Sequence, residues 1–375
     1  MVRILVDYRP ALRERTGVGE YVHELVRALT SVHGPAAQDE VAVFTASWRD
    51  RPDPGLARQL PAVRIIDRRL PVRPLTWAWN RLGWPALEWL AGPFDLVHVA
   101  APVAIPCRSA AVVLTIHDLH FLRHPDRMTA EMRRDYPALV RTHARQAPAI
   151  VVSSAYTAAD VERTLGVPAD RIHLCPPGAP PWADAVRARR GPGPGQHILF
   201  LGTLEPRKNL GVLLDAYAQV RGRVSAVPPL VLAGRAPRSA QGWIERAERP
   251  PLAGHVRVTG YVGESQRLDL LAGARLLVLP SLDEGFGLPV LEAMACGVPI
   301  VISSGGSLPE VAGDAATPVE ATDVDGFARA MTSLLDPDAA DAARARGLLR
   351  ASAFRWEACA RQVHHAYASA LERRR

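Results

Sequence analysis

The sequence is poor in cysteine, and its few cysteines do not form a motif. The four of them, Cys107, Cys175, Cys296 and Cys359, lie far apart and give no Cys-x-x-Cys pair. Closely spaced cysteines are what zinc sites and disulfide frameworks need. Neither is therefore expected, and the composition suits a reducing cytoplasm.

Long apolar runs are also missing. No stretch reaches the roughly 18 apolar residues without charge that a membrane-spanning helix requires. The first ten residues, MVRILVDYRP, have no apolar core of the kind found in a signal peptide. We therefore expect a cytoplasmic protein.

Charge is the next feature, because the formal net charge of the 375 residues is +7. A basic surface suits nucleic acid, an anionic membrane surface or an acidic substrate. No Lys/Arg-rich run stands beside aromatic residues that would stack on bases, so nucleic acid is not an expected partner.

Short apolar runs alternate with amphipathic stretches along the whole chain. These runs are continuous in Val, Ile and Leu, which indicates strands covered on both faces in parallel sheets. The expected strands are Val2–Val6, Val41–Phe44, Val63–Ile66, Leu96–Val99, Val112–Thr115, Ile150–Val152, Ile198–Leu201, Leu230–Ala233, Val256–Val258, Leu276–Leu279 and Ile300–Ile302.

A glycine- and proline-rich segment, RRGPGPG at 189–195, interrupts this alternation near the middle of the chain. Since domains commonly have about 100–200 residues, we expect two of them. Residues 1–188 form the first and residues 196–353 the second. Residues 354–375 are expected to form a helix that packs back on the first domain.

Two glutamates mark the richest motif, which runs from Ser281 to Val301. Glu284 lies in a predicted loop, EGFG, and Glu292 follows after seven residues, near the start of a predicted helix. Glycines and a helix N-terminus let backbone N–H groups approach an anion, whereas carboxylates accept hydrogen bonds from sugar hydroxyls. The pattern therefore predicts a site for a sugar nucleotide. Taken singly, Glu284 is equally explained as a solvated loop acid and Glu292 as a favourable acid in a first helical turn.

Two cations form the second motif. Arg207 and Lys208 follow the expected strand that ends near Gly202, and they precede a predicted helix for which Asn209 is the candidate N-cap. Open parallel sheets bind ligands at the edge formed by the carboxyl ends of their strands, and the two cations are expected at that edge. Two cations there would stabilise the charge on a departing nucleoside diphosphate. The alternative is an ordinary pair of solvated charges.

With these motifs the sequence resembles the retaining GT-B glycosyltransferases that carry a Glu–seven–Glu motif. That family includes bacterial mannosyltransferases, glycogen synthases and sucrose synthases. The resemblance extends over nearly the whole chain, and it implies two Rossmann-like domains that face each other across a cleft. It also implies roles for the motif residues. Glu292 would accept from donor ribose hydroxyls, Glu284 would hold the transferred sugar, and Arg207 and Lys208 would bind phosphate.

The resemblance implies further donor-binding positions. The backbone of the loop at Gly285, Phe286, Gly287 and Leu288 would contact the diphosphate or the sugar, and Tyr261 and Val262 would lie beside the base. Gly202 would end the phosphate-binding strand. Gly17 and Gly19 match the glycine loop that closes over the diphosphate, although a Gly-x-Gly pair alone is weak evidence.

One histidine is also a candidate. His117 follows the expected strand Val112–Thr115 and is followed by Asp118. The family has a His-Asp pair here, near the donor sugar. From the sequence alone, a histidine satisfied within the core is an equally good explanation.

Half of the eight tryptophans fall within residues 68–90, namely Trp77, Trp79, Trp84 and Trp89, and arginines flank them. Tryptophan beside arginine is typical of helices that lie on an anionic bilayer. The alternative is a pair of short helices whose tryptophans belong to the core. A peripheral contact with the inner face of the membrane would suit a lipid-linked sugar as acceptor.

The motifs and the resemblance together predict a glycosyltransferase that moves a hexosyl unit from a GDP- or UDP-linked sugar to an acceptor hydroxyl in polysaccharide or glycolipid synthesis. The resemblance implies that the sugar is of mannose type and that its anomeric configuration is retained. No cofactor or metal is expected, because Arg207 and Lys208 take the place of the metal. Asp323 and Asp325, which form an Asp-x-Asp, are better explained as helix-capping residues. Two alternatives stay open, namely an epimerase-like enzyme on the same fold and a non-catalytic subunit of a polysaccharide assembly complex.

Overall fold

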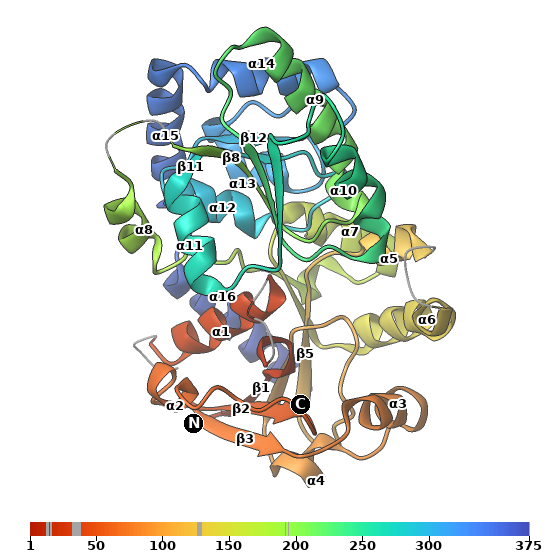
Figure 1. Ribbon diagram of the computed structural model, residues 1–375. Coiled ribbons are helices and arrows are strands. Elements are labelled where there is room, and N and C mark those ends of the chain that lie inside the picture. Colours follow the sequence, from red (N-terminus) through yellow and green to blue (C-terminus); the bar gives the residue numbers. More distant parts are fainter. Residues whose placement is uncertain are drawn as a thin grey trace. The chain divides into compact units, whose positions relative to one another are not determined.

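The computed structural model describes residues 1–12, 15, 17–31, 39–125, 130–191, 193 and 195–374. Within these residues the chain divides into two compact units (Figure 1). Unit 1 comprises Met1–Gly178 and Arg355–Arg375, and unit 2 comprises Ala179–Phe354. The division therefore falls at 178/179, ahead of the expected position at 188–196. Pro192 and Pro194 of the glycine- and proline-rich segment, and Arg375 at the end of the expected last helix, are outside the described residues.

Unit 1 is built on a parallel sheet of seven strands in the order β3-β2-β1-β4-β5-β6-β7. Its strands are β1 (Arg3–Asp7), β2 (Glu40–Ala46), β3 (Arg64–Arg68), β4 (Leu96–Val99), β5 (Ala111–Ile116), β6 (Ala149–Val152) and β7 (Ile172–Leu174). Its helices are α1 (Val18–Leu29), α2 (Leu56–Gln59), α3 (Val72–Leu82), α4 (Leu87–Ala91), α5 (His120–Arg123), α6 (Ala130–Gln146), α7 (Ala155–Leu165) and α16 (Trp356–Glu372).

Alternate residues of these strands enter two different apolar cores. Ile4 and Val6 of β1 belong to the core that α1 and α16 cover. Leu5, between them, belongs to the core on the other face, with residues of α3, α4 and α7. Because successive side chains of a strand point to opposite faces, both faces of the sheet are buried. This explains why the strands are continuous apolar runs.

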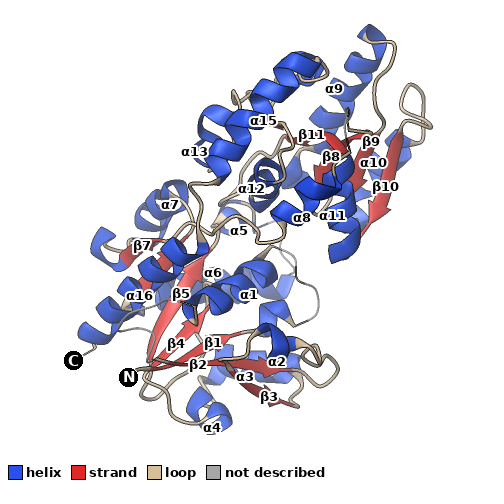
Figure 2. Cartoon of the chain, turned by 90° about the vertical axis from the view of Figure 1, so that its left-hand side faces the viewer, coloured by secondary structure: helices blue, strands red, loops and turns tan. Residues whose placement is uncertain are grey.

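The last helix, α16, is part of unit 1 although it is distant in sequence (Figure 2). Its Tyr367 hydroxyl lies 2.7 Å from Nδ1 of His98 on β4, and Nε2 of the same histidine lies 2.7 Å from the Thr115 hydroxyl on β5. Burial lowers the pKa of His98 to about 3, so the ring is neutral and links two strands to the helix. This histidine is a satisfied core residue.

Unit 2 is built on a parallel sheet of five strands in the order β10-β9-β8-β11-β12. Its strands are β8 (His197–Leu201), β9 (Leu230–Ala233), β10 (Val256–Gly260), β11 (Ala274–Leu279) and β12 (Ile300–Ile302). Its helices are α8 (Ala183–Arg189), α9 (Leu210–Arg223), α10 (Gln241–Ala247), α11 (Glu264–Gly273), α12 (Leu288–Ala295), α13 (Leu308–Ala312), α14 (Val324–Ser333) and α15 (Pro337–Ala351).

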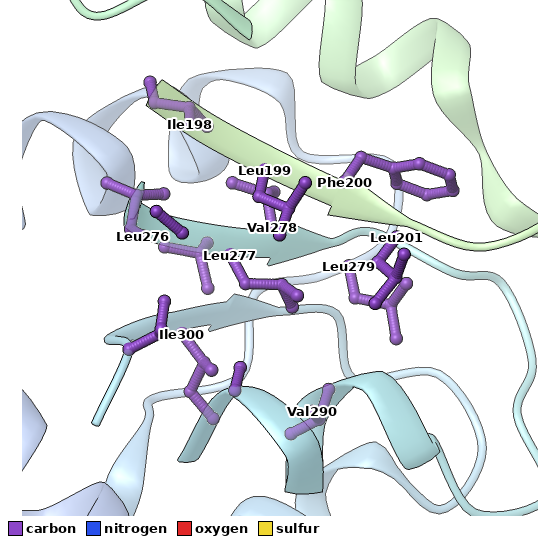
Figure 3. Packing of buried hydrophobic residues seen from close by; sticks show 14 of the residues in the cluster. Ile198, Leu199, Phe200, Leu201, Leu276, Leu277, Val278, Leu279, Val290 and Ile300 are labelled. Atoms are coloured by element: carbon purple, nitrogen blue, oxygen red, sulfur yellow. The ribbon is translucent and has the colours of Figure 1, made fainter. Parts of the chain in front are cut away.

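The core of unit 2 is formed by the central strands and the helices against them. Figure 3 shows side chains of β8, β11 and β12 packed beside each other, with Val290 of α12 against them. Ala183 and Val186 of α8 join the same core. Helix α8 therefore belongs to unit 2, whereas the expected boundary would place it in the first domain.

The strand order reverses between β8 and β11. Strands β9 and β10 extend the sheet on one side of β8, whereas β11 and β12 extend it on the other. At such a reversal the loops after the two adjacent strands turn to opposite sides and leave room for a ligand at the carboxyl edge. In unit 2 this room lies beside the loops that follow β8 and β11.

Candidate active site

Arg207 and Lys208 lie on the loop that follows β8, within the short 3₁₀ helix η5 (Pro206–Lys208). Asn209 ends this helix in the left-handed conformation, with φ of 56°. Its side-chain amide donates to the carbonyls of Pro280, at 3.1 Å, and Ala321, at 2.6 Å. Asn209 precedes α9, as predicted, but it does not cap that helix with its side chain. It instead ties η5 to the end of β11.

Glu284 lies on the loop that follows β11, and it meets both cations. The Lys208 ammonium donates to Oε1 at 2.5 Å, and the Arg207 guanidinium donates to Oε2 at 3.2 Å. The Ser281 hydroxyl also donates to Oε1, at 2.6 Å. We call these four residues the Glu284 cluster. It unites the two motifs across the reversal of strand order.

The Glu284 carboxylate is buried but ionised. Burial raises the pKa of this group, but the charges of Lys208 and Arg207 outweigh that effect, so the pKa lies below its ordinary value. A carboxylate can accept at about four positions, and three are occupied by these neighbours. Glu284 therefore positions the two cations, a function that the sequence did not indicate. The remaining acceptor capacity is compatible with the predicted contact to a sugar.

Arg207 is fixed by further contacts on both loops. Its Nη2 donates to Glu205 at 3.0 Å, and its Nη1 donates to the Asp283 carbonyl at 3.2 Å. The backbone N–H of Leu282 donates to the Arg207 carbonyl at 2.8 Å. The side chain is still 17% exposed, so a ligand can reach this buried network from the sheet edge.

The loop with Glu284 continues into α12. Gly285, Phe286 and Gly287 are buried, Leu288 is partly buried, and Gly287 begins the helix with φ of 91°. The first N–H groups of a helix have no partner in a preceding turn and can bind an anion. In α12, however, Pro289 has no N–H and the Val290 N–H donates to the Gly287 carbonyl at 2.9 Å. The Leu288 N–H at the start of the helix is therefore the group that suits the predicted backbone contact.

Gly306 is a site residue to which the sequence analysis assigned no role. It follows β12, and a Cβ atom at this position would lie 2.3 Å from the Glu284 carbonyl oxygen. The neighbouring Ser307 N–H donates to that same oxygen at 2.9 Å. Because glycine has no Cβ, the segment at Gly306 can approach the backbone of Glu284 closely, and this contact supports the loop that carries Glu284.

Glu292 lies in the second turn of α12 rather than the first, as its place in Leu288–Ala295 shows. Its carboxylate is buried and accepts from the Arg267 guanidinium at 3.2 Å. Arg267 lies on α11 and stacks over the Trp182 ring, with the guanidinium carbon 4.9 Å from the ring centroid. Neither Arg267 nor Trp182 was predicted, because no local motif marks them.

The remaining predicted positions of unit 2 differ in whether their side chains are accessible to a ligand. Tyr261, after β10, is 42% exposed, whereas the Val262 side chain is buried in the core and can offer a ligand only its backbone. Gly202 follows β8 directly, and Lys208 lies next to it. The Asp-x-Asp is a helix cap, since the Asp323 carboxylate accepts from the Gly326 N–H at 2.8 Å.

Three predicted site residues belong to unit 1. Gly17 is the residue before α1, with φ of 48°, but Gly19 lies within the helix rather than before it. His117 follows β5, and its ring meets that of Tyr21 on α1 edge-on, with centroids 5.0 Å apart. Burial lowers the pKa of His117 to about 4, and its Nε2 has no hydrogen-bond partner among the described residues. The ring is thus a neutral group with one unused nitrogen, unlike the satisfied His98.

The tryptophan-rich segment divides between core and surface. Trp79 is buried and donates from Nε1 to the Pro85 carbonyl at 2.9 Å, whereas Trp77, Trp84 and Trp89 are all more than half exposed. The core interpretation is therefore correct for one of the four. No helix in the described part of the chain has both the length and the apolar character to cross a membrane.

Comparison with known families gives two matches, one in each part of the chain. Residues 15–181 match the family described as glycosyltransferase family 4, and residues 195–337 match the family described as glycosyl transferases group 1. O-antigen chain mannosyltransferase B of Escherichia coli is 30% identical over 391 residues, which cover 98% of this chain and 99% of that protein.

Solved structures resemble the chain over nearly its whole length. Sucrose-phosphate synthase of Thermosynechococcus elongatus is 22% identical with a TM-score of 0.77, and the match covers 98% of each chain. HepE of Anabaena, in complex with UDP and glucose, is 16% identical with a TM-score of 0.69, covering 98% of this chain and 100% of that one. The two parallel-sheet units confirm the predicted GT-B fold class. The full-length similarity to the mannosyltransferase shows that the chain belongs to the group 1 glycosyltransferases and is a glycosyltransferase.

Proposed function

We propose that this glycosyltransferase moves a hexosyl unit of mannose type from a GDP- or UDP-linked sugar to an acceptor hydroxyl, and that anomeric configuration is retained. The observation that carries the proposal is the Glu284 cluster, which gathers two cations where the strand order of unit 2 reverses. The name of the Escherichia coli relative supports mannose as the sugar. The UDP and glucose bound to HepE support a nucleoside-diphosphate sugar as donor.

The chemistry follows from the charges. When the bond between the anomeric carbon and the phosphate oxygen breaks, negative charge grows on the departing nucleoside diphosphate. Arg207 and Lys208 are held by Glu284 before the donor arrives, so they stabilise that charge without rearranging. The acceptor oxygen forms the new bond to the anomeric carbon, and its proton passes to the departing diphosphate. We propose that these cations act in place of a metal ion.

A panel of sugar nucleotides tests the proposal. GDP-mannose, UDP-glucose, UDP-galactose and dTDP-rhamnose are scored by thermal shift, because a ligand at 100 times its Kd stabilises the folded state by about 2.7 kcal/mol. The stabilising donor is then incubated with candidate glycolipid acceptors, with and without EDTA. We expect release of nucleoside diphosphate that depends on acceptor and is insensitive to EDTA, and a product with the anomeric configuration of the donor. Release without acceptor, or loss of activity in EDTA, would contradict the respective part of the proposal.

Arg267 gives a separate prediction about donor binding. We expect Arg267→Met to raise the KM for the donor about tenfold, the effect of one lost hydrogen bond to a charged group, while kcat stays near the wild-type value. The reason is that Arg267 holds the Glu292 carboxylate, which is the predicted donor-binding group. Steady-state kinetics at varied donor concentration checks this.

A lysine at the same position separates positioning from folding. Arg267→Lys keeps a cation beside Glu292, so it should recover part of the donor affinity. An unchanged KM in Arg267→Met would show that Glu292 does not depend on this partner. If Arg267→Met and Arg267→Lys lose the same share of kcat and also melt at the same lowered temperature, Arg267 only stabilises the fold.

A further inference from the structure

Three of the four exposed tryptophans in the described part of unit 1 lie on α3, on α4 and on the turn between them. Trp77, Trp84 and Trp89 are 54–58% exposed, and Leu82 is 61% exposed. The rings of Trp84 and Trp89 meet edge-on with centroids 6.1 Å apart. We call Trp77, Leu82, Trp84 and Trp89 the tryptophan patch. Large exposed apolar groups gathered in one place mark interaction surfaces in soluble domains.

Packing within unit 1 does not require this patch. Helix α3 is attached to the sheet by Leu75 and Trp79, which are both buried. Trp79 also packs on Phe44 of β2, with ring centroids 6.4 Å apart, and the Arg9 guanidinium carbon lies 4.7 Å from the Trp79 ring centroid. The buried stripe of α3 is therefore complete without Trp77.

Four arginines lie close to the patch in the sequence or in the structure. Arg73 and Arg81 stand four residues before and after Trp77, so they share its face of the helix. Arg108 lies over the Trp89 ring, with the guanidinium carbon 5.9 Å from the centroid, and Arg69 is exposed just before α3. Of these four cations, Arg81 is paired with an acid, Asp135, at 2.5 Å.

The acidic group nearest to the patch in sequence offsets only part of this charge. Glu88, on α4, accepts backbone hydrogen bonds through Oε1 from Arg108 at 2.8 Å, Ser109 at 2.8 Å and Ala110 at 3.3 Å. These bonds cap the 108–110 turn, and Glu88 keeps its single negative charge. Arg69, Arg73 and Arg108 together outweigh it, so the patch keeps a positive balance, and the chain as a whole carries +7.

We propose that α3, α4 and the turn between them form a surface that docks on an anionic lipid bilayer. Indole rings insert at the level of the lipid headgroups, where their apolar body and polar N–H are both accommodated, and arginines beside them attract anionic lipids. The surface consists of projecting side chains on two short helices, which suits a deformable lipid interface. This inference concerns binding alone and does not depend on the identity of the donor or the acceptor.

Vesicle sedimentation with the full chain tests the inference. The vesicles contain phosphatidylcholine alone, or phosphatidylcholine and phosphatidylglycerol in equal amounts. We expect wild-type protein to sediment with the anionic vesicles at low salt, with a blue shift of tryptophan fluorescence, and to stay in solution with phosphatidylcholine alone. High salt should release it.

Three variants identify the residues responsible. The triple variant Trp77→Gln, Trp84→Gln, Trp89→Gln should lose at least tenfold in partition. Arg69→Gln and Arg73→Gln should each lose about fivefold, as expected for one basic residue near an anionic surface. Trp48→Gln is the matched control, because Trp48 is 70% exposed in the same unit but lies outside the patch, and it should bind like wild type.

Several outcomes would overturn the inference. They are absence of wild-type binding, equal binding of the triple variant, and equal loss in Trp48→Gln. A melting temperature equal to wild type shows that the variants are folded. If analytical ultracentrifugation finds a wild-type dimer that the triple variant abolishes, and no vesicle binding, the patch is an interface with a second copy instead.

Discussion

Replacing Lys208 with methionine is expected to lower kcat by about 100- to 1,000-fold at saturating donor. This is the cost of removing one charge-stabilising donor from a preorganised site. Methionine keeps the apolar stem but not the ammonium that lies 2.5 Å from Glu284. The buried carboxylate then retains Arg207 and Ser281 as partners, so its loop should stay folded. Steady-state release of nucleoside diphosphate measures the effect.

The composition of the chain sharpens this prediction. Lys208 is the only lysine in the sequence, and every other residue of the 45 Lys+Arg is arginine. A compact ammonium and a planar guanidinium are not equivalent as hydrogen-bond donors. We therefore expect Lys208→Arg to remain at least tenfold below wild type. Full activity in Lys208→Arg would show that only the charge matters, and wild-type turnover in Lys208→Met would remove the residue from the mechanism.

A matched control uses a cation of the same unit away from the site. Arg223, at the end of α9, is exposed and lies 3.8 Å from Asp325. Exposed pairs of this kind contribute little to stability. Arg223→Met should therefore leave both kcat and melting temperature at the wild-type values. A loss comparable to that of Lys208→Met would mean that the assay reports on net charge rather than on the site.

Replacing Glu292 with glutamine should weaken donor binding about 10- to 100-fold and change kcat much less. Hydrogen bonds to a charged group contribute about 1.5–3 kcal/mol, and the neutral amide loses that part of the binding energy. The carboxylate is buried beside Arg267, so its charge is poorly screened by water. Calorimetric titration with the donor found in the panel measures the dissociation constant directly.

Glu264→Gln provides the comparison for this variant. Glu264 is an exposed acid in the first turn of α11, the helix that also carries Arg267. It should bind the donor like wild type. If Glu292→Gln binds equally well, the predicted contact with the ribose is wrong. If it lowers kcat while binding is unchanged, Glu292 acts in the transition state rather than in holding the donor.

The fold could be predicted from local patterns because nine of the twelve described strands consist almost entirely of buried residues. Continuous apolar runs mark β1, β5 and β11 without reference to the rest of the chain. The strand that was not predicted is β7, which has three residues, Ile172–Leu174, none of them fully buried. So short and half-exposed a strand leaves no apolar run to recognise. The expected domain boundary also differs from the division of the structure. The proline- and glycine-rich segment on which it was placed is a loop within unit 2, after α8.

Sequence motifs indicated the residues of the candidate site one by one, but not the contacts that the fold makes between them. Glu284 and the two cations were each assigned from local sequence, but their contacts join positions 76 and 77 residues apart. Arg267 is an ordinary helical arginine until the fold brings it to Glu292. The exposure of Trp77 and the burial of Trp79 likewise depend on which face of α3 meets the sheet.

The central claim is that the Glu284 cluster receives the nucleoside diphosphate, and the single lysine allows one direct measurement of it. Protein grown with [13C]lysine has one lysine side chain to observe, that of Lys208. Its Cε resonance is followed by NMR during titration with UDP and with GDP, while calorimetry reports binding independently. We predict a saturating shift with the diphosphate that binds, at the calorimetric Kd, and a much smaller shift with the parent nucleoside. Calorimetric binding with no change in the Lys208 resonance would contradict the account.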